Sequence, residues 1–388
     1  MLHRTAQLAA DLRVRLHETL PSHWPSAGAM GEAIGHIFQS REFVEAWQQS
    51  FGQDRRYRPL FVEVSDASGA PLLFVPLVVE RRRGVSILTF LDQGQADYNA
   101  PILYPAAADQ GDRLSAALWT HITEALPALD VLRLEKMPPE VGGLKNPFAT
   151  LSTGPHGQAC HGNDLRRPLP EIESVLLSPK ELRQKQRGLE KLGPVRFLVA
   201  EDATTRRRLL DRLVAQKQRR FEETHVPGYA EHPEALAFLR AADETFAKSG
   251  NAFICALMVG EEVTAAQWGL VLGKHFYALV TGFEGGAWAR FSCGRILNLH
   301  LLHYLVAQGF TYFDQGYGDE AYKLRSSDTT VPLLDARMAL TARGRVHTWT
   351  EGRMDALRDL PQWELLRQLK WRIRRRLFPS GIEAKDMA

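Results

Sequence analysis

The chain has little cysteine, no long apolar run and almost no net charge. Its 388 residues include three cysteines, an odd and sparse set that excludes a disulfide framework and is typical of a reducing compartment. Because no run of about 18 apolar residues occurs, we expect no membrane-spanning helix. A formal net charge of +3 is too small to indicate nucleic-acid binding. These absences predict a cytoplasmic protein, with room for a peripheral contact at the inner face of the membrane.

What is present is typical of a globular protein. The composition is 45% hydrophobic and 24% charged, and a chain of this length can bury two cores. The stretch from Met1 to Arg15 includes Asp11 and no apolar core, so we expect no signal peptide. We predict four parts: an N-terminal extension with one weak helix (residues 1–35), a first domain (36–170), a second domain (171–345) and a C-terminal helical tail (346–388).

One order of elements occurs twice along the chain. The first copy opens on a helix capped by Ser40, with Phe43 and Trp47 on its apolar face. Its strands are predicted at 60–64, 71–79 and 85–90, followed by a loop, a helix near 111–126 and a strand at 131–134. The second copy is predicted to have a strand at 195–199, helices at 204–223 and 233–248, strands at 253–259, 263–272 and 275–282, a loop at 284–294, a helix at 295–308 and a strand at 310–315. Two copies of one α/β unit with mixed sheets are the simplest account, although chance also produces alternating strands and helices.

A change of composition separates the two copies. Residues 138–170 are rich in Pro, Gly and polar residues, which predicts a linker or a long loop. Ser178, Pro179 and Glu181 have the order of a helix start, and Gly193-Pro194 is the matching stop. The helix between them carries a basic stripe, either a solvated face or a binding surface for a polyanionic substrate or membrane phosphates. The stripe consists of Lys180, Arg183, Arg187 and Lys191.

The C-terminal stretch 353–378 is predicted to be helical. Its leucines and tryptophans fit either packing on the body of the protein or an interfacial membrane contact. Arg372 and Arg376 lie four residues apart and have the spacing of a weak site for a nucleotide second messenger. Such pairs are common on helix faces, so the pattern has little specificity.

A loop and a polar strand end lie one helix apart near residue 300. The loop opens the predicted helix, where unpaired backbone N–H groups and the helix dipole favour an anion. Arg290 and Arg295 supply charge for a pyrophosphate held there. The next strand ends at Asp314, at the sheet edge where α/β folds bind ligands. This arrangement predicts an acyl-CoA site, the alternative being an ordinary helix-entry loop. The predicted donor loop consists of Arg290, Phe291, Ser292, Cys293, Gly294 and Arg295.

Three polar residues near this loop each have a functional and a structural interpretation. Asp314 either orients or deprotonates an acceptor amine, or it belongs to a turn. Gln267 lies on a central strand and is either an acceptor contact or a hydrogen bond at the edge of the core. Lys323 pairs either with a phosphate or with Glu320 in a surface salt bridge.

Residues elsewhere in the chain raise further hypotheses. Asp97 and Tyr98 lie in the first-copy counterpart of the loop at 284–294, so they line an acceptor cleft if the two copies face each other. Cys293 has no matched histidine and carboxylate spacing, which favours a small filler over a nucleophile. The set His156, Cys160 and His161 matches no zinc spacing, and we predict no metal.

Short motifs in a fixed order carry a family resemblance. The second half contains Ser178-Pro-Lys-Glu-Leu-Arg, then Arg290-x-Ser-x-Gly-Arg, then Gly309-Phe-Thr-Tyr-Phe-Asp-Gln-Gly with Tyr322-Lys323 behind it. The first half contains Phe43-x-x-x-Trp47, Pro76-Leu77 and Asp97-Tyr98. Over residues 38–340 the chain resembles the CelD-type (BcsL-like) branch of the GNAT acyltransferase superfamily, which is associated with exopolysaccharide and cellulose synthesis.

The resemblance implies a fold and an activity. It implies tandem GNAT domains, as in the FemABX aminoacyl transferases, and acyl transfer from acetyl-CoA or another acyl-CoA to an amino sugar of an exopolysaccharide or its lipid-linked precursor. It also implies that Tyr322 protonates the leaving thiolate, the alternative being a half-buried core aromatic. A similar group serves holdfast polysaccharide synthesis, which suggests control by cyclic di-GMP.

The donor loop departs from the usual GNAT pattern, Arg/Gln-x-x-Gly-x-Gly/Ala, because it contains a single glycine, Gly294. This departure leaves open whether the donor is CoA or another acyl carrier. Two alternatives therefore stand beside the acetyltransferase. One is a FemABX-type transferase that uses aminoacyl-tRNA, and the other is a non-catalytic cyclic di-GMP sensor in polysaccharide assembly.

Overall fold

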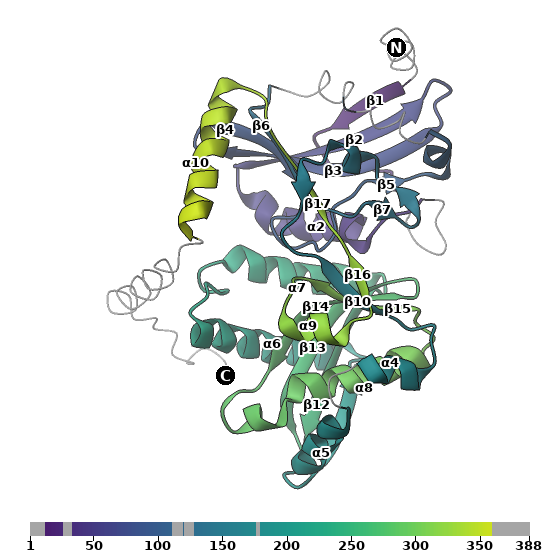
Figure 1. The fold of residues 1–388 in the computed structure, drawn as a ribbon, viewed down its shortest axis with the longest axis vertical. Helices are drawn as coiled ribbons and strands as arrows, with labels where there is room; N and C mark the ends of the chain where they lie inside the picture. The colour runs from purple at the N-terminus through teal and green to yellow at the C-terminus, as the bar shows by residue number, and fades with distance from the viewer. Residues whose placement is uncertain (1–11, 26–32, 111–118, 120–127, 176–178, 359–388) are drawn as a thin grey trace.

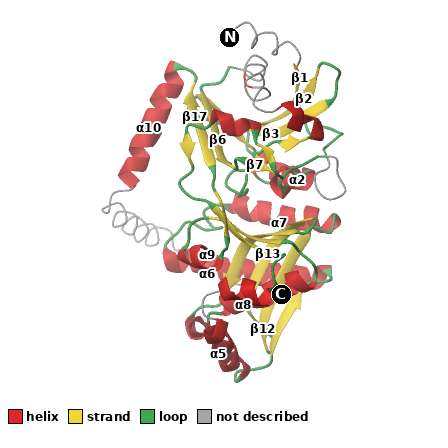
Figure 2. Cartoon of the chain, turned by 45° about the vertical axis from the view of Figure 1, so that its right-hand side comes forward, coloured by secondary structure: helices red, strands yellow, loops and turns green. Residues whose placement is uncertain are grey.

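Two β-sheets lie one above the other along the longest axis of the molecule (Figure 1). The computed structural model describes residues 12–25, 33–110, 119, 128–175 and 179–358. Helices α2 (Arg41–Gln49) and α7 (Pro233–Lys248) pack against each other in the layer between the sheets (Figure 2). Ser40 caps α2 as predicted, because its hydroxyl accepts a hydrogen bond from the Phe43 N–H at 3.3 Å.

The first sheet belongs mainly to the N-terminal half. Among the described residues its order is β1-β2-β3-β4-β6-β17-β9, with β5 paired to β3. Residues 72–80, which belong to strand β3, are all buried, as expected for a strand covered on both faces. The bounds are β1 Leu12–His17, β2 Tyr57–Asp66, β3 Pro71–Arg82, β4 Val85–Phe90, β5 Ile102–Leu103, β6 Val131–Met137, β9 Gly154–Pro155 and β17 Leu334–Ala339.

The second sheet has the order β11-β12-β13-β14-β15-β10-β16. Its strands are β10 Cys160–Asp164, β11 Val195–Val199, β12 Ala252–Val259, β13 Glu262–Leu272, β14 His275–Phe283, β15 Tyr312–Tyr317 and β16 Thr329–Val331. The remaining α-helices are α4 Leu169–Val175, α5 Pro179–Glu190, α6 Ala203–Thr224, α8 Cys293–Ala307, α9 Ala321–Ser326 and α10 Ala342–Arg358. Short 3₁₀ helices lie at η1 Ile37–Gln39, η2 Phe51–Gln53, η3 Pro105–Gln110, η4 Pro147–Leu151 and η5 Gly286–Phe291, and β7 (Glu140–Val141) and β8 (Leu144–Lys145) form a separate ribbon.

Both sheets follow one topology, which confirms the mixed α/β tandem fold. In the first, β2, β3 and β4 are antiparallel and β6 lies parallel to β4. In the second, β12, β13 and β14 are antiparallel and β15 lies parallel to β14. A parallel pair needs a long crossover, and α8 provides it in the second sheet. The helix predicted near 111–126 would provide it in the first, but apart from Trp119 it lies outside the described residues.

The two units exchange one strand. β17, from the C-terminal part of the chain, pairs antiparallel with β6 of the first sheet. β10, from before the second unit, pairs antiparallel with β15 of the second sheet. In Figure 1 the yellow-green β17 therefore runs up into the upper sheet, while the teal β10 lies in the lower one. The boundary expected at residue 170 does not separate the two sheets. We call β10 and β17 the exchanged strands.

The chain path differs from the prediction at residues 138–170, and it includes a strand near the N-terminus that was not predicted. This strand, β1, forms because Leu12, Val14 and Leu16 alternate with charged residues and pair with the edge of β2. The weak helix expected in residues 1–35 stays a prediction, because residues 1–11 lie outside the described residues. The predicted linker at 138–170 contains β10, which two neighbouring strands recruit through backbone hydrogen bonds. The helix predicted after Ser178 is confirmed as α5, although Ser178 itself lies outside the described residues.

A shared hydrophobic core joins the two units. The rings of Phe43 on α2 and Phe238 on α7 lie 5.0 Å apart, and those of Phe38 and Tyr277 lie 5.4 Å apart. All four side chains are buried and belong to one cluster that includes residues of both sheets. No helix in the described part of the chain has the length and apolarity needed to cross a membrane. Of the predicted C-terminal tail, the described part ends with α10.

Candidate active site

Strands β14 and β15 separate from each other partway along their length. Their parallel pairing covers only three residues on each strand, from His275 opposite Tyr312 to Tyr277 opposite Asp314. Beyond that point, residues 278–283 of β14 pair with β13 alone among the described strands, while β15 remains paired with β10, its partner from Tyr312 to Tyr317. The sheet therefore opens at Asp314. Beyond Tyr277, the edge of β14 that faces β15 has no strand partner among the described residues.

The predicted donor loop lies beyond the end of β14, at the N-terminus of α8. Ser292 has φ +55°, a left-handed conformation that turns the chain from η5 into α8. The guanidinium of Arg290 lies 4.7 Å from the centre of the Phe291 ring. The loop thus has the expected helix entry, with an exposed cation beside it.

Helix α5 holds the donor loop in place. Lys185 on α5 donates a hydrogen bond to the Ser292 hydroxyl at 2.8 Å. A Cβ at Gly188 would lie 2.9 Å from the Phe291 ring, so only glycine allows this close packing. Arg295 reaches Glu181 at 4.0 Å. Lys185 and Arg295 therefore add positive charge around the N-terminus of α8, which favours an anionic ligand there.

Tyr98 and Asp314 bring the two units together at the opening. The Tyr98 hydroxyl donates a hydrogen bond of 2.8 Å to Oδ2 of Asp314, and the Gly316 N–H donates one of 2.8 Å to Oδ1. His275 Nε2 lies 3.4 Å from Oδ2. Asp314 is fully buried and Tyr98 is 2% exposed. The prediction that the first-copy loop faces the second unit agrees with this geometry.

Asp97, like Tyr98, reaches the opening from the first unit. A Cβ at Gly316 would lie 2.8 Å from Asp97 Oδ2, and Gly316 has φ +80°, so both space and backbone require glycine. Burial and the neighbouring Asp314 raise the pKa of Asp97 to about 6, against the opposing effects of Lys136, Lys323 and the Tyr317 N–H. A carboxyl group with a pKa this high can exchange a proton near neutral pH.

Lys323 is buried instead of forming an open phosphate contact. It is 5% exposed, and its ammonium donates to the Tyr317 carbonyl at 2.5 Å and pairs with Glu320 at 3.1 Å. Lys217 on α6 lies close enough to Glu320 and Lys323 to interact electrostatically, and burial lowers the pKa of Lys217. Sequence reasoning missed Lys217, because a single lysine on a charged helix has no distinguishing pattern.

Tyr322 lies on α9, the helix that follows β15. It is 46% exposed, and partial burial together with Glu320 raises its pKa to about 12. Its phenol therefore stays protonated and can donate a proton.

Gln267 belongs to the core of the sheet. It is 1% exposed, its amide donates to the Trp268 carbonyl at 2.7 Å, and its carbonyl accepts from Thr281. These bonds correspond to the structural interpretation of Gln267.

Burial shifts the pKa values of Cys293 and His36. His36, like Lys217, was not singled out from the sequence. Cys293 is 3% exposed, and burial raises the pKa of its thiol, which opposes a role as a thiolate nucleophile. His36 stacks on Tyr98 with ring centres 4.6 Å apart. Burial and the neighbouring His275 lower the pKa of His36 to about 4 despite Asp314. A neutral histidine and a protonated tyrosine thus lie beside Asp314 where the two units touch.

The three residues weighed as metal ligands have separate partners. His156 contacts Asp335 and Tyr317, and His161 contacts Asp319 at 2.8 Å. Within the described residues, no group of three or more histidine, cysteine or carboxylate side chains has the geometry of a metal site.

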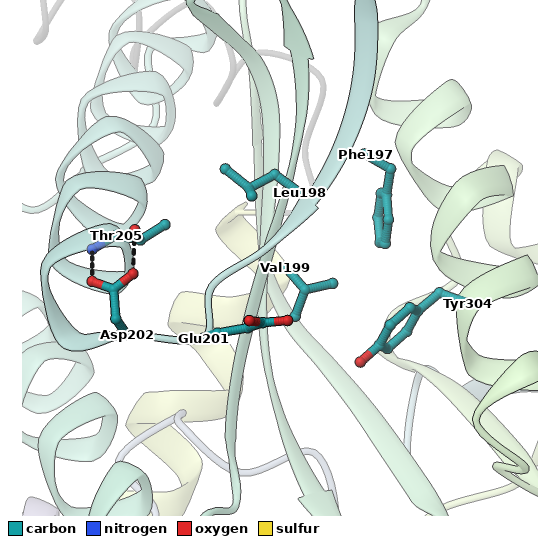
Figure 3. A pocket seen from close by; sticks show the side chains of 7 residues that line it. All are labelled: Phe197, Leu198, Val199, Glu201, Asp202, Thr205 and Tyr304. Carbon is teal, nitrogen blue, oxygen red and sulfur yellow. Dashed lines mark hydrogen bonds between the residues drawn. The ribbon is translucent and has the colours of Figure 1, made fainter.

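A surface cavity of about 420 Å³ lies away from these residues. It is formed by the end of β11, the start of α6 and Tyr304 near the C-terminal end of α8, whereas the donor loop is at the N-terminal end of that helix (Figure 3). Asp202 points back to cap α6 through Thr205. None of the predicted site residues lines this cavity. Its lining consists of Phe197, Leu198, Val199, Glu201, Asp202, Thr205 and Tyr304.

Residues 179–324 match the model of a family described as an acetyltransferase (GNAT) domain. The second unit has a GNAT fold. The matched stretch begins at α5, includes the donor loop and the opening between β14 and β15, and ends within α9. No curated protein sequence matches the chain.

Solved structures extend the similarity to both units. The crystal structure of FemX has a TM-score of 0.53 and 9% sequence identity, over 79% of this chain and 93% of that chain. A conserved protein of unknown function from Bacteroides thetaiotaomicron has a TM-score of 0.50 and 12% identity, over 78% and 90%. A tandem GNAT protein from the clavulanic acid biosynthesis pathway has a TM-score of 0.41 and 10% identity, over 73% and 84%. At such identities the similarity to FemX establishes the fold alone, so the CelD-type and holdfast assignments stay predictions.

Proposed function

We propose that the protein transfers an acetyl group from acetyl-CoA to an amine on a sugar of an exopolysaccharide or of its lipid-linked precursor. The observation that carries this proposal is the opening between β14 and β15 beside the N-terminus of α8. An extended pantetheine arm fits an opening between two strands because the unpaired backbone of β14 supplies its hydrogen bonds. The diphosphate then lies at the donor loop, with Arg290, Lys185 and Arg295 nearby.

The first unit supplies the wall for the acceptor. Asp97 and Tyr98 reach the opening from the first sheet and meet Asp314 there. Asp314 already accepts two hydrogen bonds, so its role is to orient polar groups at the site. The buried ammonium of Lys323 and the neighbouring Lys217 favour an acceptor that carries negative charge, such as a lipid-linked diphosphate sugar.

The chemistry needs only a few specialised residues. Holding the amine against the thioester carbonyl removes about 7–11 kcal/mol of the barrier in good geometry. The amine nitrogen then forms a bond to the acyl carbon, and the carbon–sulfur bond breaks with its electron pair on sulfur. Tyr322 gives its proton to the departing thiolate, which contributes roughly 10²–10⁴-fold.

Titration calorimetry with acetyl-CoA tests the donor site. Gly294→Trp fills the donor loop, because even a Cβ at Gly294 would lie 3.2 Å from the Phe283 ring. We expect affinity to fall at least about 10-fold, corresponding to about 1.4 kcal/mol. Gly352→Trp is the matched control, since Gly352 also lies on a helix and a Cβ added there would have no atom within 4 Å. Equal affinity of the two variants would contradict the donor assignment.

Two ligands distinguish the alternatives. Acetyl-CoA binding without binding of cyclic di-GMP favours the transferase, and the reverse favours a sensor. An aminoacyl transferase of the FemABX type would bind charged tRNA, with an affinity that falls steeply between two salt concentrations. Release of free CoA thiol in the presence of glucosamine, but not of glucose, would identify an amine acceptor.

A further inference from the structure

Three side chains from separate segments form a hydrogen-bonded chain beside the opening. His156 Nδ1 lies 2.7 Å from Asp335 Oδ1, and His156 Nε2 lies 2.9 Å from the Tyr317 hydroxyl. His156 precedes β10, Tyr317 ends β15, and Asp335 lies on β17. Both the histidine and the aspartate side chains are nearly buried, at 13% and 11% exposure.

The partners set the direction of the hydrogen bonds when His156 is neutral. A carboxylate can only accept, so neutral His156 carries its hydrogen on Nδ1 and donates it to Asp335. The unprotonated Nε2 then accepts from the Tyr317 hydroxyl. In other enzymes a carboxylate, an imidazole and a hydroxyl in this order activate a nucleophile or a base. Here the hydroxyl in the last position is the phenol of Tyr317.

Other charged groups face this chain from each neighbouring element. Asp335 also accepts a bond from the Lys136 N–H at 3.2 Å and lies 3.5 Å from the Arg337 guanidinium. The Lys136 ammonium lies 5.9 Å from the centre of the Tyr317 ring, and Asp319 also acts on Tyr317 electrostatically. The Lys136 N–H and the Arg337 guanidinium therefore hold the Asp335 carboxylate in place, and a fixed carboxylate can orient the imidazole of His156.

Tyr317 is tied to the candidate active site by its backbone. Its N–H bonds to Asp97, and its carbonyl accepts from Lys323 at 2.5 Å. It lies three residues beyond Asp314 on the same strand, and its side chain is partly exposed. Tyr317 is thus placed to contact an acceptor held between the units.

We propose that Tyr317, His156 and Asp335 form a proton relay that takes the proton from the acceptor during acyl transfer. This rests on the proposed function and adds to it. As the acceptor nitrogen or oxygen bonds to the acyl carbon, its proton passes to the Tyr317 oxygen. The phenol proton passes to His156 Nε2, and Asp335 stabilises the resulting imidazolium. The thiolate leaves with the electron pair of the carbon–sulfur bond and takes its proton from Tyr322. Tyr317 touches the acceptor, whereas His156 and Asp335 are positioning residues.

An aryl sulfonyl fluoride tests the relay without acetyl-CoA. The phenol oxygen forms a bond to sulfur, fluoride leaves with its electron pair, and the phenol proton passes to His156. Peptide mass spectrometry should find Tyr317 labelled at least 10-fold faster than Tyr322, which is 46% exposed. His156→Gln and Asp335→Asn should each slow labelling of Tyr317 at least 10-fold, and Tyr317→Phe should abolish it.

His161→Gln is the matched control. His161 also joins β10 to a carboxylate, Asp319, but its second nitrogen contacts Thr330 and reaches no phenol. The rate at which Tyr317 is labelled in His161→Gln should equal the rate in the wild type. Labelling that ignores His156, or that is no faster at Tyr317 than at Tyr322, overturns the relay. Urea unfolding of each variant separates a loss of relay from a loss of fold.

Turnover gives a second readout. If the wild type releases CoA thiol with glucosamine, Tyr317→Phe and Asp335→Asn should lower kcat on the order of 10²-fold while the KM for acetyl-CoA stays unchanged. His156→Gln should lower kcat in the same way, whereas His161→Gln should not. An unchanged kcat in all relay variants also overturns the relay. Wild-type protein that fails to bind acetyl-CoA refutes the proposed function, and the labelling result still decides the relay.

Discussion

The two units use the segment after their third antiparallel strand in different ways. In the second unit β14 leads into η5 and α8, whose N-terminus follows the donor loop. In the first unit β4 leads into a loop closed by buried polar contacts: Asp92 pairs with Lys136 at 2.7 Å and accepts from Asn99 at 2.7 Å. In the proposed function, one copy of the repeat therefore offers backbone to the donor, and the other presents side chains to the acceptor.

This comparison shows how a duplicated fold divides its work. Although burial opposes ionisation, the Lys136 ammonium holds the pKa of Asp92 below its usual value. The resulting ion pair fixes the loop that delivers Asp97 and Tyr98 to Asp314. In the second unit Arg219 pairs with Glu284 just after β14, and α5 in addition packs directly on the loop through Gly188. Charge therefore acts at this topological position in both units, and the second unit adds close packing by a helix.

Removing the charge should break the first unit's loop. Lys136→Met leaves Asp92 buried without its cation, and we expect a loss of about 3–5 kcal/mol in the free energy of unfolding. Urea denaturation followed by tryptophan fluorescence measures it. Lys248→Met is the control, because the Lys248–Glu244 pair is 70% exposed on both sides and should contribute less than about 1 kcal/mol. Equal losses would mean that the loop does not depend on its ion pair.

The exchanged strand of the second sheet should tolerate less added volume than the edge strand of the first. A Cβ at Gly162 in β10 would lie 2.4 Å from the Tyr312 hydroxyl and 2.8 Å from the Phe313 carbonyl, so Gly162→Ala should cost about 1–3 kcal/mol. Gly154 in β9 has no atom within 4 Å of such a Cβ, and Gly154→Ala should be close to neutral. Urea midpoints of the two variants compare the sheets directly, and similar midpoints would contradict the tight packing of β10.

Two groups where the units meet should oppose each other as pH changes. The pKa of His36 is lowered from 6.5 to about 4, so the stability it contributes is present above pH 6.5 and is lost as pH falls toward 4. The pKa of Asp97 is raised from 3.8 to about 6, so its contribution is present below pH 3.8 and is lost as pH rises through 6. In the wild type the two partly cancel between pH 4 and 6.

Single variants should reveal the two opposed slopes. Relative to wild type, His36→Phe should lose stability as pH rises from 4 to 6.5, and Asp97→Asn should gain stability as pH rises from 4 to 6. After allowance for solvent screening, we expect each change to be on the order of 1 kcal/mol. Urea midpoints at half-unit pH steps measure both, and curves parallel to wild type would show that neither group titrates as described.

Strong local patterns made much of the fold predictable. The bounds of β11 and α7 agree with the sequence prediction, because Pro233 marks a helix start and the apolar residues of the strand stand between turn signals. β10 was missed because Cys160–Asp164 has neither alternation nor high strand propensity. Its place depends on neighbours about 150 residues away in sequence, and no local window contains that information.

The candidate site was predictable only residue by residue. Asp314 and Tyr98 were each singled out, one by its strand end and the other by the repeat, but their hydrogen bond depends on how the units pack. His36, Tyr317 and Asp335 were missed, because each has an ordinary sequence context. Lys136 adopts φ +60°, which no pattern in the sequence indicates for a lysine.

The exchanged strands also determine when the first sheet can be completed during synthesis. β6 leaves the ribosome about 200 residues before β17, the strand that covers its edge. At about 5–20 residues per second, that edge waits roughly 10–40 s with its backbone groups unpaired. The nascent first half therefore depends on its own C-terminal region for completion, and a ribosome stalled before residue 334 carries an open sheet that a chaperone or a second nascent chain can engage.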